Sequence, residues 1–198
     1  MSDSSEVYYI VLRGSRRQPI FKDDEDRRHF ARVVADTAAA CHVTVHAYCW
    51  LQDEARLAAQ MPDIPVSEFA RRVTEQHAQR LEEERSLTGA DFDQRYRGVR
   101  VDGPTALLDL VRHIHLAPLK AGLTEDLLRY PWSSHRVYMG LDVAPWLNIE
   151  DTLLHFADTE GGDARVGYSE FMAQGATKID RAAVPSAPIP APKSAHRP

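Results

Sequence analysis

The chain has 198 residues, of which 43% are hydrophobic and 27% are charged, and its formal net charge is −5. This composition is typical of a water-soluble globular protein of ordinary domain size, and no apolar run approaches the ~20 residues that span a bilayer. The first residues are polar and acidic, unlike a secretory signal, and the two cysteines, Cys41 and Cys49, are too few for a disulfide framework. We therefore expect a cytoplasmic protein with reduced thiols and no membrane association.

The charge is unevenly distributed along the chain. Residues 176–198 carry four basic side chains, one acidic side chain and five prolines, whereas the rest of the chain carries 20 basic and 28 acidic residues. The Pro/Ala-rich end is predicted to be a disordered tail. A negatively charged body repels DNA at long range, so binding to nucleic acid would need a locally basic patch. Composition therefore argues against a strong nonspecific DNA binder.

The first part of the chain predicts a strand, a basic turn and a helix. Residues 7–13 are rich in β-branched and aromatic side chains, which favours a strand, and the turn that follows contains Arg16 and Arg17. Asp23 or Asp24 can cap the next helix, since a carboxylate accepts hydrogen bonds from the free N–H groups of a first turn.

Two further strands are predicted over residues 42–50 and 51–59. In the first, polar and apolar residues alternate, which places on one face Val43, Val45, Ala47 and Cys49. In the second, Glu54 and Arg56 are two residues apart and therefore share a face. Glutamate can ligate a metal ion, but a guanidinium, which is always charged and has no acceptor, cannot. We expect these two side chains to form an ion pair, which contributes little if it is exposed.

A helix and a further strand follow. A loop with two prolines at 61–66 leads into a helix from about residue 67 to 85, whose end is acidic at Glu82–Glu84. An acidic run of this kind favours an ordinary solvated helix face over a DNA-binding one. Residues 88–102 are predicted to form a loop and strand that contain Arg95, Tyr96 and Arg97.

The stretch from Asp102 to Gly122 predicts a core helix that ends in a tight turn. Asp102 can cap the helix, and Pro104 suits its first turn, where a missing N–H costs nothing. Apolar residues then recur at near-helical spacing, at Leu107, Leu108, Val111, Ile114 and Leu116. Pro118 ends or kinks the regular helix, and Gly122 closes the turn.

Five motifs, in order between Tyr8 and Gly140, resemble a known family: YYIVLRGSRRQPIF, AYCWLQDEARLAA, TGADFDQRYRGVRVD, LVRHIHLAPLKAGL and RYPWSSHRVYMG. They are similar to the REP-associated tyrosine transposases, single-tyrosine HUH-type enzymes that cut and join single-stranded DNA. The resemblance implies an α+β fold, with a ferredoxin-like antiparallel sheet of four or five strands and helices packed on one face. It divides the chain into a transposase-like domain at 1–144, a helical extension at 145–175 and the tail at 176–198.

The resemblance also indicates where the chain departs from the chemistry of the family. The nucleophilic tyrosine of the family, in a helix that usually reads R-Y-I-H-L-N-P, corresponds to His113, and the asparagine of that motif corresponds to Ala117. The two histidines of M-P-N-H-x-H-L-L, which bind the divalent metal ion, correspond to Glu54 and Arg56, whereas His115 matches the family and is expected to be structural. We therefore name no catalytic residue and no metal ligand. No cofactor is expected, except Mg²⁺ or Mn²⁺ if residual activity exists.

The family's basic loop, which commonly follows a strand reading Y-H-V-x-x-R-G-N-R-R-Q, helps to hold DNA. Arginine and tyrosine together can grip a phosphate and stack on a base, a common way of binding single strands. The resemblance therefore gives six candidate DNA contacts: Arg13, Arg16, Arg17, Arg95, Tyr96 and Arg97. The alternative is a solvated basic turn with a structural tyrosine and surface arginines.

The sequence is compatible with three functions. The leading hypothesis is a catalytically inactive, host-adopted DNA-binding protein of transposase ancestry, with hairpin or single-stranded DNA as its partner. The second is a residual metal-dependent nuclease or strand-transfer enzyme that uses Glu54 and His113. The third is a protein-interaction module without DNA binding, which the acidic body favours.

Overall fold

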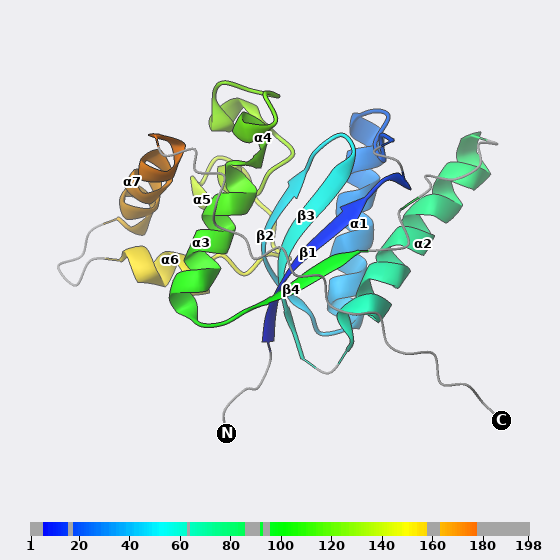
Figure 1. Cartoon of the computed structure of the whole chain (residues 1–198), viewed down its shortest axis with the longest axis horizontal. Coiled ribbons are helices and arrows are strands. Elements are labelled where there is room, and N and C mark those ends of the chain that lie inside the picture. The colour runs from blue at the N-terminus through cyan, green and yellow to red at the C-terminus, as the bar shows by residue number, and fades with distance from the viewer. Residues whose placement is uncertain are drawn as a thin grey trace.

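A computed structural model describes residues 6–15, 18–62, 64–85, 92, 96–157 and 163–177. Its first part follows a βαββαβ order (Figure 1), formed by β1 (Glu6–Arg13), α1 (Asp24–Ala40), β2 (Thr44–Trp50), β3 (Glu54–Met61), α2 (Val66–Arg85) and β4 (Arg97–Val101). The four strands form one antiparallel sheet in the order β2-β3-β1-β4. This is the ferredoxin-like arrangement. The expected α+β fold with an antiparallel sheet is confirmed.

Local sequence signals account for the boundaries of α1. The side chain of Asp23 accepts hydrogen bonds from the backbone N–H groups of Glu25 and Asp26, both at 3.0 Å, and so caps the helix as expected. Three acidic residues in the first turn favour the positive end of the helix dipole. The buried face of the helix, which includes Phe30 and Val34, then packs on the sheet.

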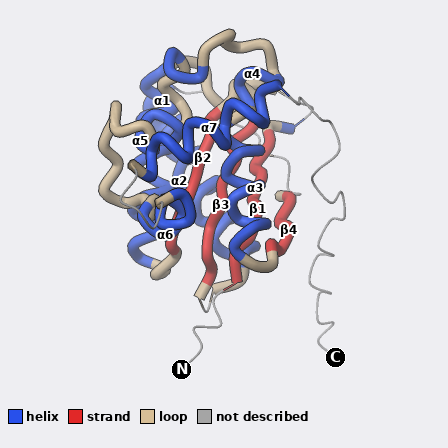
Figure 2. Tube along the Cα trace, turned by 90° about the vertical axis from the view of Figure 1, so that its left-hand side faces the viewer, coloured by secondary structure: helices blue, strands red, loops and turns tan. Residues whose placement is uncertain are grey.

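Helices cover both faces of the sheet, whereas the resemblance led us to expect helices on one face. One face, with Ile10 and Leu57, packs against α1 and α2. The opposite face, with Tyr9 and Val11, packs against α3 (Pro104–His115) and the helices after it, which lie in front of the strands in Figure 2. The physical reason is visible in β1, where four consecutive residues, 9–12, are all buried. Apolar side chains on both faces of a strand require cover on both sides.

A bulge in β2 also changes which residues share a face. The pairing with β3 shifts between Val45 and Ala47, so that His46 is an extra residue in the ladder. Val45 and Trp50 therefore belong to the core on the α1 side, and Ala47 and Cys49 to the core on the α3 side. The prediction that Val45, Ala47 and Cys49 share one face was wrong, because simple alternation assumes that no residue is inserted.

The core helix and its turn form largely as expected. Gly103, with φ 87°, is the N-cap residue of α3, and no side chain caps the helix; Asp102 instead accepts a hydrogen bond from Arg100. The expectation that Asp102 caps the helix was therefore wrong. After α3 comes α4 (Ala117–Lys120), and Gly122 closes the turn with φ 68°. This positive φ favours glycine.

The remaining elements extend the core on the α3 side. They are η2 (Leu127–Arg129), α5 (His135–Tyr138), α6 (Glu150–Leu153), η3 (Leu154–Phe156) and α7 (Ala164–Thr177). Tyr168 and Met172 of α7 are buried in the same core as α3. The tail beyond 177 lies outside the described residues, among which no helix is long and apolar enough to cross a membrane.

A buried hydrogen-bond network holds α7 to α3. The Tyr168 hydroxyl lies 2.7 Å from Nδ1 of His115 and 2.6 Å from Nδ1 of His135. Nε2 of His115 lies 2.6 Å from the Ser134 hydroxyl, which also bonds the backbone of Tyr48 in β2. Burial holds the pKa of both imidazoles below its ordinary value, with that of His135 at about 4. His115 is thus part of a neutral network within the core.

Candidate functional site

The fold brings together the positions that the sequence resemblance assigns to chemistry. Glu54 and Arg56 project from β3 onto the sheet face that α3 covers, and His113 projects from α3. Nη1 of Arg56 lies 3.4 Å from Nε2 of His113. Ala117 begins α4, one turn after His113, and is buried. The sheet and two helices therefore build one site at the end of the sheet near the β2–β3 turn.

A buried carboxylate lies at the centre of this site. The Glu54 side chain is only 3% exposed. Its Oε2 accepts a hydrogen bond from Nε of Arg13 at 2.6 Å, and its Oε1 accepts one from Nε of Arg56 at 2.5 Å and a further one from Nη2. Burial alone raises the pKa of Glu54, but the two guanidinium groups outweigh burial and hold it below the usual range. Glu54 is therefore an ionised carboxylate with both oxygens occupied.

Strand pairing explains why Arg13 takes part. Glu54 is directly opposite Arg13 in the β1–β3 ladder, and Arg56 is opposite Val11. Residues that are paired in an antiparallel ladder point to the same face, with their Cβ atoms about 4.5–5.5 Å apart. The result is an Arg13–Glu54–Arg56 triad, whose arginine side chains are 27% and 17% exposed. The Glu54–Arg56 ion pair expected from the sequence is present, but it is largely buried, so the small contribution to stability that is typical of exposed pairs does not apply to it.

The neighbour of His113 is a tyrosine from β1 that the sequence patterns did not single out. The hydroxyl of Tyr9 lies 3.3 Å from Nε2 of His113, and the two rings meet edge to face at 5.5 Å. Burial raises the pKa of Tyr9 to about 12, and burial, followed by repulsion from Arg56 and Lys120, lowers the pKa of His113 to about 4. His113 is therefore neutral at pH 7, and its Nε2 shares one lone pair between two possible donors, the Tyr9 hydroxyl and the Arg56 guanidinium.

The positions of the tyrosine and histidine are exchanged relative to the family pattern. The strand pattern Y-H-V has histidine where this chain has Tyr9, and the helix pattern R-Y-I-H has tyrosine where this chain has His113. The sequence therefore contained one signal that could have revealed Tyr9. It has a tyrosine in place of the pattern's histidine at position 9 and a histidine in place of the pattern's tyrosine at position 113. The contact between the two positions could be found only once the packing of β1 against α3 was known.

Cations outnumber acids at this site. Lys120, at the end of α4, is exposed as a residue, but partial burial of its charged group, followed by repulsion from Arg56 and Arg112, lowers its pKa. Arg13 and Arg56 contact one carboxylate, Glu54, and Lys120 is close enough to repel Arg56, so these four side chains together carry an excess of two positive charges while His113 is neutral. This local excess contrasts with the net charge of −5 of the whole chain.

The six predicted DNA contacts do not all lie on one face. Arg13 belongs to the triad, and Arg97 is exposed on β4, opposite Val11 and hence on the same face. Tyr96 lies on the other face, in a cleft that Phe92 and Thr74 of α2 also line. Three of the six lie outside the described residues: Arg16, Arg17 and Arg95.

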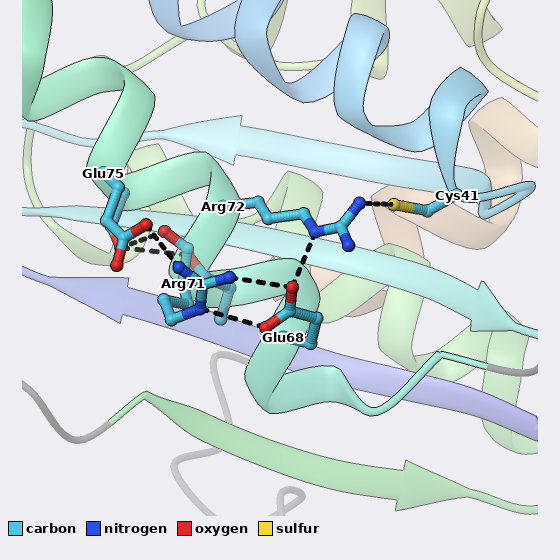
Figure 3. Close-up of polar contacts among 7 residues, drawn as sticks. Cys41, Glu68, Arg71, Arg72 and Glu75 are labelled. Atoms are coloured by element: carbon cyan, nitrogen blue, oxygen red, sulfur yellow. Dashed lines mark hydrogen bonds and ion pairs between the residues drawn. The ribbon is translucent and has the colours of Figure 1, made fainter.

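The arginines at the start of α2 are matched by acids of the same helix. Figure 3 shows Arg71 between Glu68 and Glu75, and Arg72 between Glu68 and the thiol of Cys41. Arg71 and Arg72 together lower the pKa of Glu68 to about 2. These exposed pairs leave no excess positive charge among the residues shown. The side chains of Glu82–Glu84, for which a solvated helix face was expected, lie outside the described residues.

The residues at the site do not fit a divalent metal ion. Both oxygens of Glu54 are occupied by guanidinium groups, and Arg56 brings a fixed positive charge to the second ligand position. In the described part of the chain, no group of three or more His, Cys, Asp or Glu side chains could hold a metal ion. The donor set is therefore cationic, whereas Mg²⁺ and Mn²⁺ prefer oxygen ligands.

Comparison with known proteins shows which solved structures share the fold of this chain. No protein-family profile and no curated protein sequence matches the chain. A solved structure of a REP-associated tyrosine transposase bound to a REP hairpin matches with a TM-score of 0.58 and 15% identity, over 81% of this chain and 92% of that one. A putative transposase from Deinococcus radiodurans R1 matches with a TM-score of 0.43 and 12% identity, over 62% of this chain and 92% of that one. The chain has a fold similar to that of the REP-associated tyrosine transposase.

Proposed function

We propose that the chain is a DNA-binding protein of transposase ancestry that holds hairpin or single-stranded DNA and does not cut it. The observation that carries the proposal is the Arg13–Glu54–Arg56 triad, in which Glu54 and Arg56 stand at the positions where the sequence resemblance expects metal ligands. The likeness in fold to a transposase solved with a hairpin supports DNA as the partner.

The chemistry of the site supports the absence of cleavage. Transfer of a DNA phosphodiester to tyrosine needs an accessible oxygen nucleophile and a cation that offsets the developing charge. At the nucleophile position His113 presents an imidazole, and Ala117 offers no ligand one turn later. The phenol that contacts His113, that of Tyr9, is 7% exposed and has a raised pKa. A buried phenol of this kind is a poor nucleophile.

DNA binding is tested by affinity across a salt series. We expect hairpin and single-stranded oligonucleotides to bind with a dissociation constant that rises steeply with salt, because each neutralised phosphate releases counterions. Arg97→Gln should weaken binding and lower the salt slope by about 1. Arg32→Gln, which removes an exposed arginine of α1 on the other side of the sheet, is the matched control and should change neither. Absence of DNA binding in the wild-type chain would leave the protein-interaction module as the better hypothesis.

Residual strand transfer is a second candidate, favoured by the contact between the Tyr9 hydroxyl and His113. In that reaction the phenol oxygen would attack phosphorus, His113 would take the phenol proton, and the 3′ oxygen of the broken P–O bond would leave and take a proton from water. The product would be a covalent protein–DNA adduct. Incubation with Mg²⁺ or Mn²⁺ followed by mass spectrometry tests it. An adduct that is lost in Tyr9→Phe would refute the proposal that the protein does not cut DNA.

A further inference from the structure

The site that does not fit a metal ion has the composition of an anion site. Its two guanidinium groups are fixed from one side by the same buried carboxylate, with Nε of each directed at Glu54. A guanidinium has five N–H donors in a rigid fork. Arg56 uses Nε and Nη2 on Glu54 and one donor on His113, so two of its N–H groups remain. Arg13 uses Nε on Glu54, and among the described residues no partner is seen for its terminal nitrogens.

The charges around these donors are also favourable for an anion, because positive side chains outnumber the one carboxylate, Glu54. Glu54 neutralises one of the two arginines, and Lys120 adds a further positive charge that is close enough to Arg56 for the two to repel each other. A phosphate anion would relieve this repulsion. The arginines are partly exposed, at 27% and 17%, so an anion can approach them without unfolding the core.

We propose that Arg13, Arg56 and Lys120 form a phosphate-binding site that works without a metal ion, and that Glu54 positions the two guanidinium groups. The fixed charge of Arg56 lies at a position where a transposase of this kind would hold its metal. This inference rests on the proposed DNA binding for the source of the phosphate, which is the DNA backbone, with free inorganic phosphate as the other source. Guanidinium forks match the oxygen geometry of both.

The first arm of the test uses inorganic phosphate as the probe. Backbone amide NMR spectra of the ¹⁵N-labelled full chain are recorded with EDTA in excess, while sodium phosphate is titrated against sodium chloride at equal ionic strength. We expect saturable shifts around residues 56, 113 and 120 that need no Mg²⁺. The variant Lys120→Gln should weaken phosphate binding severalfold, and the matched control Lys22→Gln, at an exposed lysine before α1, should not.

The second arm uses a DNA hairpin. Lys120→Gln should reduce the salt slope of hairpin binding by about 0.9, the value for one lost phosphate contact, while Lys22→Gln leaves it unchanged. EDTA should not alter the affinity of the wild-type chain. Arg56→Lys retains a charge beside Glu54 but loses the fork, and should weaken both probes; thermal melts of every variant exclude loss of the fold as the cause.

The outcomes separate this inference from the proposed function. Hairpin binding with no phosphate-specific shift, or with Lys120→Gln equal to wild type, overturns the phosphate site and leaves DNA binding in place. Phosphate shifts without hairpin binding support the site, make free phosphate its ligand and overturn the proposed DNA binding. Binding of either probe that disappears with EDTA overturns the claim that no metal is needed.

Discussion

At the residue scale, the buried carboxylate of Glu54 depends on its two arginines. Taking a charge out of water costs several kcal/mol, and a partner is what makes the buried ion tolerable. With a side chain that is 3% exposed, Glu54 has few water molecules available to replace a lost guanidinium. The triad is therefore a place where the loss of one partner is costly, even though a buried ion pair is weak evidence for stability in itself.

We predict that Arg56→Met destabilises the fold by about 2 kcal/mol at pH 7, somewhat less than a fully uncompensated buried charge because Arg13 remains. Since the pKa of Glu54 is lowered in the folded chain, its stabilisation is present above the unfolded value of about 4.3 and is lost as the pH falls through the folded value. The difference between variant and wild type should therefore persist from pH 7 to pH 5.5 and shrink only below about pH 4.3. Urea unfolding at pH 7 and pH 5.5 measures it.

The control for this prediction is an arginine in an exposed pair. Arg100 pairs with Glu6 and Asp102 on the surface of β4, where water screens the charges. Arg100→Gln should change the free energy of unfolding little at either pH, because water screens an exposed pair. An equal cost for Arg56→Met and Arg100→Gln would contradict the view that burial makes the triad matter.

Sequence spacing predicted part of this site and could not predict the rest. The two-residue spacing of Glu54 and Arg56 was sufficient to place them on one face as an ion pair. The contributions of Arg13 and Tyr9 depend on the β1–β3 register and on the packing of α3, which join residues 41 and 104 positions apart. A local pattern has no information on such pairs, because register is set by the whole sheet.

At the scale of elements, α7 is held to the core by one hydroxyl shared between two imidazoles. Tyr168 and His115 are both fully buried, and the ring of Tyr168 also packs against Tyr138. Further contact comes from Arg112 of α3, whose guanidinium lies 4.1 Å from the centroid of Phe171 in α7. The extension at 145–175 thus shares its core with the domain before it.

We predict that Tyr168→Phe destabilises the chain by about 1–3 kcal/mol, because Nδ1 of both His115 and His135 loses its partner in a site that water does not reach. Hydrogen exchange should accelerate in α7 more than in β1. Tyr8→Phe, which removes a partly exposed hydroxyl bonded to Glu6, is the matched control and should cost about 0.5 kcal/mol or less. Unchanged exchange in α7 would show that the network does not hold the helix.

Local sequence signals predicted where helices and turns begin and end better than they predicted which face of the sheet a side chain lies on. The Asp23 cap and the Gly122 turn were predicted because one residue type determines each. The bulge at His46 was missed, because an inserted residue has no composition of its own and only the pairing with β3 reveals it. Residues 9–12 of β1 are apolar on both faces of the strand, a pattern that favours cover on both sides, whereas the family resemblance implied helices on one face.

At the scale of the whole molecule, burial of neutral histidines couples folding to pH. Among the described residues, burial lowers the pKa of five histidines spread over both cores: His46, His77, His113, His115 and His135. In three of them, His77, His113 and His135, the folded value is about 4. The unfolded value is about 6.5, so between these limits the unfolded chain binds more protons than the folded chain. Stability must therefore fall as the pH drops through this window.

We predict that the free energy of unfolding is nearly constant from pH 8 to pH 7 and falls steeply between pH 6.5 and pH 4.5. Each histidine can lower the free energy of unfolding by up to about 1.4 kcal/mol per pH unit. The loss from three histidines over two pH units is therefore comparable to the whole free energy of unfolding of a typical domain, ~5–15 kcal/mol. Urea midpoints at half-unit steps measure the slope. His77→Phe, in a pocket with Phe21 and Phe30, should lower the slope by one histidine's share. A flat profile would mean that these imidazoles are solvated in the folded chain.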